Sequence, residues 1–160
     1  MAEWTHLDQT GKPGMVDVSG KEITVRRAVA ESRILVGRSI ADAMKDGELL
    51  TKKGAVLQTA IIAGTQGAKK TSELIPFCHP LPLDGCRIDA KFDGESSIVV
   101  RCECRTTART GVEMEALAGA SIAALTIYDM CKALDKGIVI EQTRLIEKDG
   151  GKSGHWEAEQ

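Results

Sequence analysis

Two alternating runs joined by a short turn constrain the fold of this chain more than any other feature of its sequence. From 86 to 92, apolar residues occupy every second position and charged residues stand between them. Asp93-Gly94-Glu95 supplies residues typical of a turn, and a second alternating run covers 98–105. Strict alternation places one kind of side chain on each face of a strand. The pattern therefore predicts a β-hairpin with one face toward a core.

Further elements flank this hairpin. Residues 23–36 are rich in β-branched types and predict a strand, and residues 138–146 predict the last strand. Small residues gather on one face of 54–71, and 111–134 is largely apolar, so both predict helices. The order strand, helix, strand, strand, helix, strand matches the split βαβ arrangement. We therefore expect an α+β, ferredoxin-like domain, a four-stranded antiparallel sheet with two long helices on one face.

The length of 160 residues suits one domain. Residues 1–14 and 150–160 mix Gly and polar types without periodicity, so we expect a flexible N-terminal arm and a flexible Gly-rich C-terminal tail around a single catalytic domain at 15–149. The helix expected at 111–134 carries more small residues than one sheet contact requires. It packs closely either against another helix of the same chain or across a subunit interface.

Composition excludes several classes of protein. The net charge of −2, from 21 basic and 23 acidic side chains, creates no positive electrostatic field that would attract nucleic acid or a membrane. Only 3% of the residues are aromatic, which leaves few rings for stacking RNA bases. No apolar run approaches bilayer-spanning length, and the N-terminus lacks a secretory signal. The five cysteines form neither CxxC pairs nor a disulfide framework. We expect a cytoplasmic protein with reduced thiols, in which Cys102 and Cys104 are small core residues.

The helix expected at 111–134 carries charges at both ends of an apolar segment. Thr110 and Glu113 fit a capping box that fixes its start, and Glu115 follows within the first turn. At the other end, Asp129 and Lys132 are spaced to touch across one turn. Such charges on an otherwise apolar helix indicate a functional site.

Two further segments bear groups suited to chemistry. The loop at 73–82 contains three prolines around Cys78 and His79, so a rigid backbone presents these side chains. Cys78 is interpreted as a packing residue or a substrate contact, because nothing nearby in sequence lowers its pKa. Lys53 precedes the helix expected from 54, where backbone N–H groups favour an anion, although surface lysines are commonly only solvated.

No cofactor or metal is expected. The chain contains neither GxxxxGK[ST] nor GxGxxG, so a standard nucleotide-binding loop is excluded. His79, Glu113 and Glu115 carry the groups that ligate Mg²⁺ or Zn²⁺, but no HExxH, CxxC or EF-hand spacing supports a metal site. The residues alone predict acid–base chemistry on an anionic small molecule.

Long blocks of the chain closely resemble the molybdenum cofactor biosynthesis protein C (MoaC) family. They stand in family order at 15–19, 68–76, 78–81, 110–117, 123–133 and 150–154, and they include Cys78-His79-Pro80-Leu81. The resemblance implies a cyclic pyranopterin monophosphate synthase, a phosphorus–oxygen lyase without a resident cofactor. Such an enzyme converts 3′,8-cyclo-7,8-dihydro-GTP, made by a partner radical enzyme, to cyclic pyranopterin monophosphate and pyrophosphate. The resemblance also implies a homohexamer, a trimer of dimers with active sites at subunit interfaces.

Carried over by position, the resemblance assigns catalysis to Asp129, Lys132 and Lys53. It assigns substrate contacts to Phe77, Cys78, His79, Glu113, Met114 and Glu115. Under this interpretation Asp129 and Lys132 move protons during ring opening and reclosure, and Lys53 neutralises triphosphate charge. His79 and Glu115 orient the purine-derived part of the substrate.

Two other classes of function compete with the enzyme. A non-catalytic, ferredoxin-like ligand-binding regulatory module would use Asp129 and Lys132 only as a structural ion pair. That class does not explain why polar residues stand at four positions beside an apolar framework: Lys53, His79, Glu113 and Glu115. An RNA-binding protein is disfavoured by the charge balance and the scarcity of aromatic residues.

Overall fold

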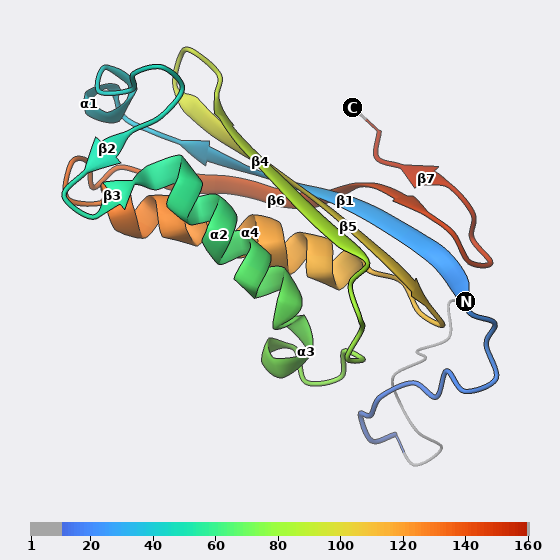
Figure 1. Ribbon diagram of the computed structural model, residues 1–160. Coiled ribbons are helices and arrows are strands. Elements are labelled where there is room, and N and C mark those ends of the chain that lie inside the picture. Colours follow the sequence, from blue (N-terminus) through green and yellow to red (C-terminus); the bar gives the residue numbers. More distant parts are fainter. Residues whose placement is uncertain (1–10, 160) are drawn as a thin grey trace.

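The computed structural model describes residues 11–159, so most of the arm predicted at 1–14 lies outside the described residues. The long elements follow the predicted order: β1 (Thr24–Leu35), α2 (Val56–Lys69), β4 (Gly85–Phe92), β5 (Ser97–Ala108), α4 (Glu113–Cys131) and β6 (Val139–Asp149). Short elements lie between them: α1 (Arg38–Ala41), β2 (Leu50–Thr51), β3 (Gly54–Ala55), α3 (Thr71–Leu74) and β7 (Trp156–Glu157). Figure 1 shows how α2 and α4 lie side by side across the sheet.

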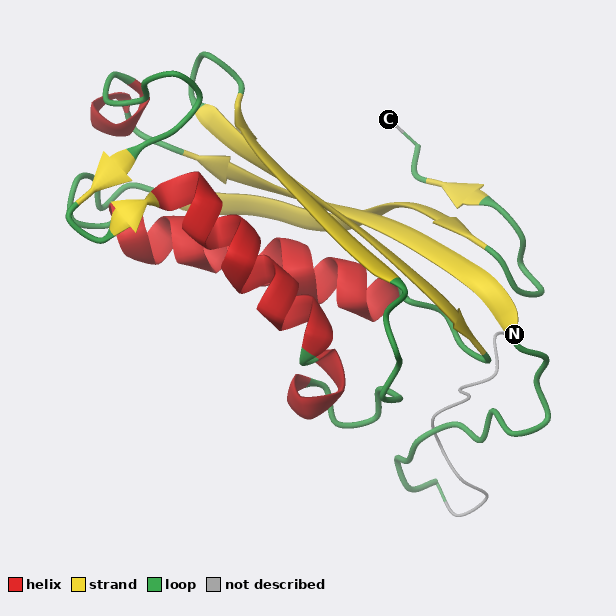
Figure 2. Ribbon diagram, viewed as in Figure 1, coloured by secondary structure: helices red, strands yellow, loops and turns green. Residues whose placement is uncertain are grey.

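The main sheet has the strand order β4-β5-β1-β6-β7, and every neighbouring pair is antiparallel. Both long helices cover the same face (Figure 2), so the α+β class and the antiparallel sheet are confirmed. The predicted count of four strands is wrong, because β7 adds a fifth from within the predicted tail 150–160. Gly150 and Gly151 have positive φ and reverse the chain, which lets Trp156 pair with Lys148. A strand of two residues has no alternation to recognise.

The predicted hairpin is confirmed. β4 and β5 pair from Gly85 opposite Arg105 to Phe92 opposite Ile98. At the turn, Asp93 Oδ1 accepts the backbone N–H groups of the three residues 95–97 at 2.9–3.0 Å. One carboxylate therefore supplies the acceptors that the short turn lacks.

The core lies between this sheet and the two helices. Alternate residues of β5 are fully buried, and they meet the small residues of α4: Ala116, Ala120, Ala123 and Ala124. A Cβ on Gly64 of α2 would lie 2.7 Å from the carbonyl oxygen of Gly119, so the two helix backbones nearly touch. The small residues of α4 thus make a close helix contact within the chain.

Helix α4 corrects the expectation that no apolar segment reaches bilayer-spanning length. Over Glu113–Cys131 it has the length and the mean hydropathy, 1.2, of a candidate membrane span. Half of that segment is buried inside the fold, against α2, β1, β5 and β6. The core helix of a soluble protein passes the same test, because burial in protein selects the same residues as burial in lipid.

Candidate active site

Lys53, Asp129 and Lys132 meet at one end of the helical layer. Lys53 Nζ donates to Asp129 Oδ2 at 2.7 Å, and Lys132 Nζ lies 2.7 Å from Asp129 Oδ1. Lys53 stands in the turn between β2 and β3, where its N–H donates to Thr51 Oγ1 and Gly54 has a φ of 108°. This turn places the side chain of Lys53 against the last turn of α4. We call these three residues the Lys–Asp–Lys triad.

The charges of the triad follow from its hydrogen bonds. Lys132 and then Lys53 lower the pKa of Asp129 to about 2, because both ammonium groups bond its carboxylate. In turn Asp129 raises the pKa of Lys132. At neutral pH the triad therefore holds one carboxylate between two ammonium groups. The three side chains are 53–56% exposed, so the group is open to a ligand.

The opposite end of α4 borders a cavity of about 800 Å³ rich in basic residues. Its charged lining residues are Lys21, Glu22, Arg26, Arg109, Glu113, Lys148 and Lys152. Lys148 Nζ binds Glu113 Oε1 at 2.8 Å, which ties β6 to the start of α4. Sequence reasoning missed Arg26 and Lys148, since they lie far apart in the chain, on β1 and β6, and only the sheet order brings them together.

The predicted capping box is wrong. Val112 is the N-cap of α4 and makes no side-chain cap bond, whereas Glu113 turns to Lys148 instead. The helix nevertheless starts within two residues of the predicted start at 111. A partner from a distant strand has replaced the local bond that the spacing suggested.

The proline-rich loop forms a second, more apolar cavity of about 410 Å³. Phe77, Cys78 and His79 line it together with Glu113 and Met114 at the start of α4. Thr110, Gly111 and Glu113 line both cavities, so the two spaces adjoin. The structure thus brings five of the six predicted substrate-contact residues to one place.

Glu115 is the exception among these residues. It is only 3% exposed and lines neither cavity. Its Oε2 atom has no hydrogen-bond partner among residues 11–159. Burial, opposed by a backbone hydrogen bond and assisted by the nearby charge of Glu113, raises the pKa of Glu115 to about 6. Burial and then Glu115 also raise the pKa of Cys78.

The predicted site residues fall into two groups at opposite ends of α4. The rise along the 16 residues from Glu113 to Asp129 is about 24 Å. The triad lies at the C-terminal end, and the two cavities adjoin the N-terminal end. One ligand of ordinary size does not span both groups within a single chain.

Two groups of side chains in the described part of the chain have the spacing of metal ligands. One consists of Cys86, Cys102 and Cys104, and the other of Glu147, Asp149 and His155. The second group is only partly buried and already paired, since His155 Nδ1 lies 2.7 Å from Asp149 Oδ1. Neither group includes His79, Glu113 or Glu115.

Fold and site together define an α+β protein with an exposed, ion-paired lysine–carboxylate group and a separate cation-rich cavity, an arrangement suited to binding a small anion. The chain belongs to the MoaC family, whose model matches residues 15–151. It is 55% identical over 151 residues to a cyclic pyranopterin monophosphate synthase from Xanthomonas oryzae pv. oryzae (strain MAFF 311018), covering 94% of this chain and 92% of the relative.

Two further relatives agree with this assignment. The cyclic pyranopterin monophosphate synthase of Xanthomonas axonopodis pv. citri (strain 306) is 54% identical, with the same coverage of both chains. A molybdenum cofactor biosynthesis bifunctional protein from Synechocystis sp. (strain ATCC 27184 / PCC 6803 / Kazusa) is 50% identical over 154 residues. That match covers 94% of this chain and 44% of the bifunctional protein.

Proposed function

We propose that this protein is a cyclic pyranopterin monophosphate synthase of molybdenum cofactor biosynthesis. It converts 3′,8-cyclo-7,8-dihydro-GTP to cyclic pyranopterin monophosphate and releases pyrophosphate, as a lyase. Relatives with 50–55% identity over nearly the whole chain carry names from this pathway. The observation that carries the proposal is the convergence of Lys53, Asp129 and Lys132, the three residues that the family resemblance assigns to catalysis.

The triad supplies both partners for proton transfer. A carboxylate whose pKa is about 2 stays ionised at neutral pH, so Asp129 has no proton to donate and is in the form that accepts one, as a weak base while both ammonium groups hold it. The ammonium groups of Lys53 and Lys132 are the donors, each held by the carboxylate at 2.7 Å. Ring opening and reclosure require a proton to leave one atom of the substrate and another to arrive. We assign these two steps to the carboxylate and the ammonium groups of the triad.

The two cavities suit the two parts of the substrate. The cation-rich cavity attracts the triphosphate, with Lys148 and Arg26 among its donors. Phe77, His79 and Met114 give the adjoining cavity an apolar wall for the purine-derived part. Lys53 neutralises charge as pyrophosphate leaves. Glu115, which the family resemblance assigns to the purine-derived part, is only 3% exposed in the single chain.

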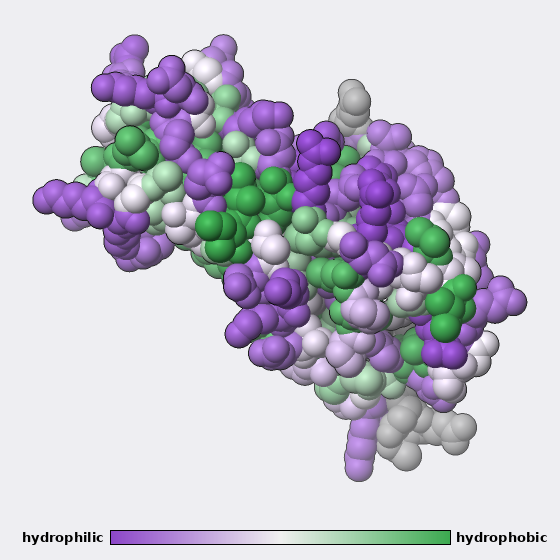
Figure 3. Space-filling view, in the orientation of Figure 1, coloured by the Kyte–Doolittle hydropathy of each residue, from purple (hydrophilic) through white to green (hydrophobic). Residues whose placement is uncertain are grey.

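We further propose that the active site is completed by a second copy of the chain, in a homohexamer built as a trimer of dimers. Two observations support assembly. The catalytic and substrate-contact groups lie about 24 Å apart along α4, so a neighbouring chain has to supply the missing half. Apolar side chains also gather over the helices in Figure 3, and Ile62 of α2 is 63% exposed and Leu125 of α4 is 54% exposed.

The remaining assignments complete the proposal. The four long strands follow the order β4-β5-β1-β6, which supports a ferredoxin-like fold for a single catalytic domain at 15–149. The enzyme works in the cytoplasm without a resident cofactor. It depends on a radical enzyme for its substrate, since cyclisation of GTP between the sugar and the base requires such chemistry.

The test is incubation of the purified chain with 3′,8-cyclo-7,8-dihydro-GTP. Pyrophosphate release is measured by a coupled assay, and the product is oxidised to a fluorescent pterin for chromatography. The proposal predicts equal amounts of pyrophosphate and pterin. A non-catalytic binding module would instead bind the cyclised nucleotide and return it unchanged, and that outcome would refute the proposal.

A further inference from the structure

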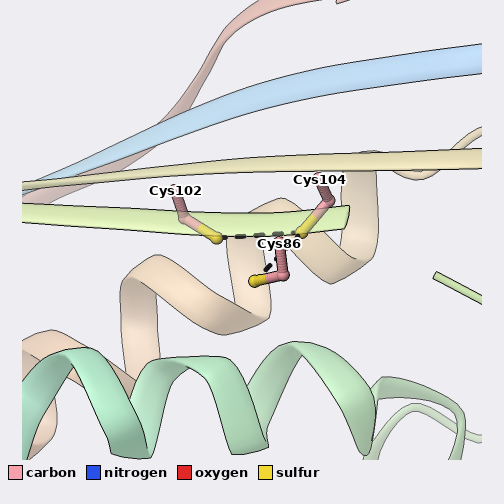
Figure 4. A group of neighbouring side chains, drawn as sticks. All are labelled: Cys86, Cys102 and Cys104. Carbon is pink, nitrogen blue, oxygen red and sulfur yellow. Dashed lines mark hydrogen bonds between the residues drawn. The ribbon is translucent and has the colours of Figure 1, made fainter. Parts of the chain in front are cut away.

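Three thiols meet under the helical layer, away from the candidate active site. Cys86 lies on β4, and Cys102 and Cys104 lie on β5, with Cys86 directly opposite Cys104 in the sheet register. The sulfur of Cys104 is 3.8 Å from the sulfurs of both other residues. All three sulfurs lie within 4.8 Å of one another and point to a common space, as Figure 4 shows.

The surroundings of this cluster are enclosed but not sealed. Cys102 and Cys104 are fully buried. Helix α4 closes over them at Gly119, where a Cβ would lie 2.6 Å from the sulfur of Cys102. Cys86 is only partly buried and lines a cavity of about 360 Å³ with Thr65, Lys69 and Leu81. An ion can therefore enter past Cys86 and reach sulfurs that bulk water does not.

We propose that these three thiols form a binding site for a soft monovalent cation, Cu⁺. A triangle with two edges of 3.8 Å and a third no longer than 4.8 Å has its centre about 2.2–2.5 Å from each corner. This matches the bond of about 2.3 Å between a thiolate and a d¹⁰ metal ion. The backbone thus already holds the sulfurs at ligand spacing, and little rearrangement is needed.

The number of ligands favours Cu⁺ over Zn²⁺. Structural zinc sites in proteins are four-coordinate, with thiolate, imidazole or carboxylate ligands. Within the part of the chain that the structure describes, this group contains three sulfurs and no imidazole or carboxylate. Thiolates are the ligands that select Cu⁺, which is satisfied by three of them in one plane. Binding displaces the thiol protons to solvent, so affinity rises with pH.

A bound ion would tie β4 to β5 directly below the proline-rich loop. Leu81 of that loop and Cys86 line the same cavity, and Thr106 Oγ1 of β5 donates to the carbonyl oxygen of Pro82 at 2.5 Å. An ion that binds the folded chain and not the unfolded one stabilises the fold. This role does not involve the triad, so it stands apart from the proposed function.

The test is titration of the reduced chain with Cu⁺ in the absence of oxygen, against bathocuproine disulfonate as a competing chelator. Native protein is expected to hold one Cu⁺ per chain. Cys86→Ala, the least buried of the three positions, is expected to weaken binding at least a hundredfold. Cys131→Ala removes a buried thiol outside the cluster and is expected to bind as the native chain does.

Circular dichroism of each variant controls for folding, and Cys104→Ala provides a second substitution in the cluster. Equal copper retention by native protein and Cys86→Ala would overturn the proposal, as would a native chain that loses all copper to the chelator. A parallel titration with Zn²⁺ tests the coordination number. Tighter retention of Zn²⁺ than of Cu⁺ at the same thiols would overturn the assignment to a three-coordinate ion.

Discussion

The ammonium group of Lys53 lies 2.7 Å from the carboxylate of Asp129, although 76 positions separate the two residues in the chain. The β2–β3 turn carries the first residue and the last turn of α4 carries the second. Both side chains are more than half exposed, so the ion pair does not compensate for the burial of either charge. An exposed pair of this kind contributes little to stability, and its placement is better explained by chemistry.

Loss of Lys148 should weaken substrate binding more than turnover. Lys148→Ala removes a cation from the large cavity and leaves Glu113 without its partner at 2.8 Å. Because hydrogen bonds to charged groups contribute about 1.5–3 kcal/mol, kcat/KM should fall roughly 10- to 100-fold, mainly through KM. Steady-state kinetics measure this. Lys91→Gln, an exposed lysine paired with Asp89 on β4, is the control and should behave as the native enzyme.

Mixed oligomers test whether two chains build each site. Asp129→Asn and Lys148→Ala remove groups from opposite ends of α4. If each site takes these groups from different chains, random co-assembly of the two variants restores both groups in about a quarter of the sites. Co-expressed protein should then show about a quarter of native activity at low substrate concentration. Activity no higher than the mean of the separate variants would place both groups in one chain.

Glu115 should make stability depend on pH between about 4.5 and 6. Its folded pKa, about 6, lies above its ordinary value of 4.5, so the stabilisation is complete below 4.5 and is lost as pH rises through 6. Glu115→Gln does not ionise and escapes this loss. Relative to native protein, the variant should gain on the order of 1 kcal/mol between pH 4 and pH 7.5. Urea unfolding at both pH values measures the difference.

The exposed turn residue Glu95 provides the control for this comparison. Glu95→Gln should change the free energy of unfolding equally at both pH values, because its side chain is not buried. A Glu115→Gln variant that behaves in the same way would show that burial does not hold this carboxyl group protonated.

The close approach of the two helices should make Gly119 intolerant of a side chain. In Gly119→Ala the new Cβ would lie 2.6 Å from the sulfur of Cys102 and 3.3 Å from the carbonyl oxygen of Gly64. Overpacking should cost about 1–3 kcal/mol, beyond the gain of about 1 kcal/mol in helix propensity. Thermal unfolding measures the change. Gly85→Ala, whose Cβ would meet no atom within 4 Å, should change stability by less than about 0.5 kcal/mol.

The parts of the fold that were predictable are those coded locally. The 86–105 hairpin follows from alternation and from Asp93-Gly94, and the structure pairs it as expected. Strand β7 was missed because two residues give no pattern and its partner is specified only by the reversal at Gly150. A non-local contact thus decides the part of the fold that was missed.

The same distinction applies to the candidate site. Asp129 and Lys132 are one helical turn apart, so their contact could be predicted from spacing. Nothing local placed Lys53 beside them, and that assignment came from the family resemblance. Spacing also misled at Glu113, where Lys148 from β6 replaced the expected capping partner.

Turnover of 3′,8-cyclo-7,8-dihydro-GTP by Asp129→Asn tests the central role of the triad most directly. The substitution keeps the size of the side chain and removes the charge that both lysines bind. Because general acid–base groups contribute about 10²- to 10⁴-fold, kcat should fall at least a hundredfold while the fold is retained. Lys52→Gln, beside Lys53 in the chain, should leave kcat unchanged. Pyrophosphate release by Asp129→Asn at a rate near that of the native chain would contradict this account.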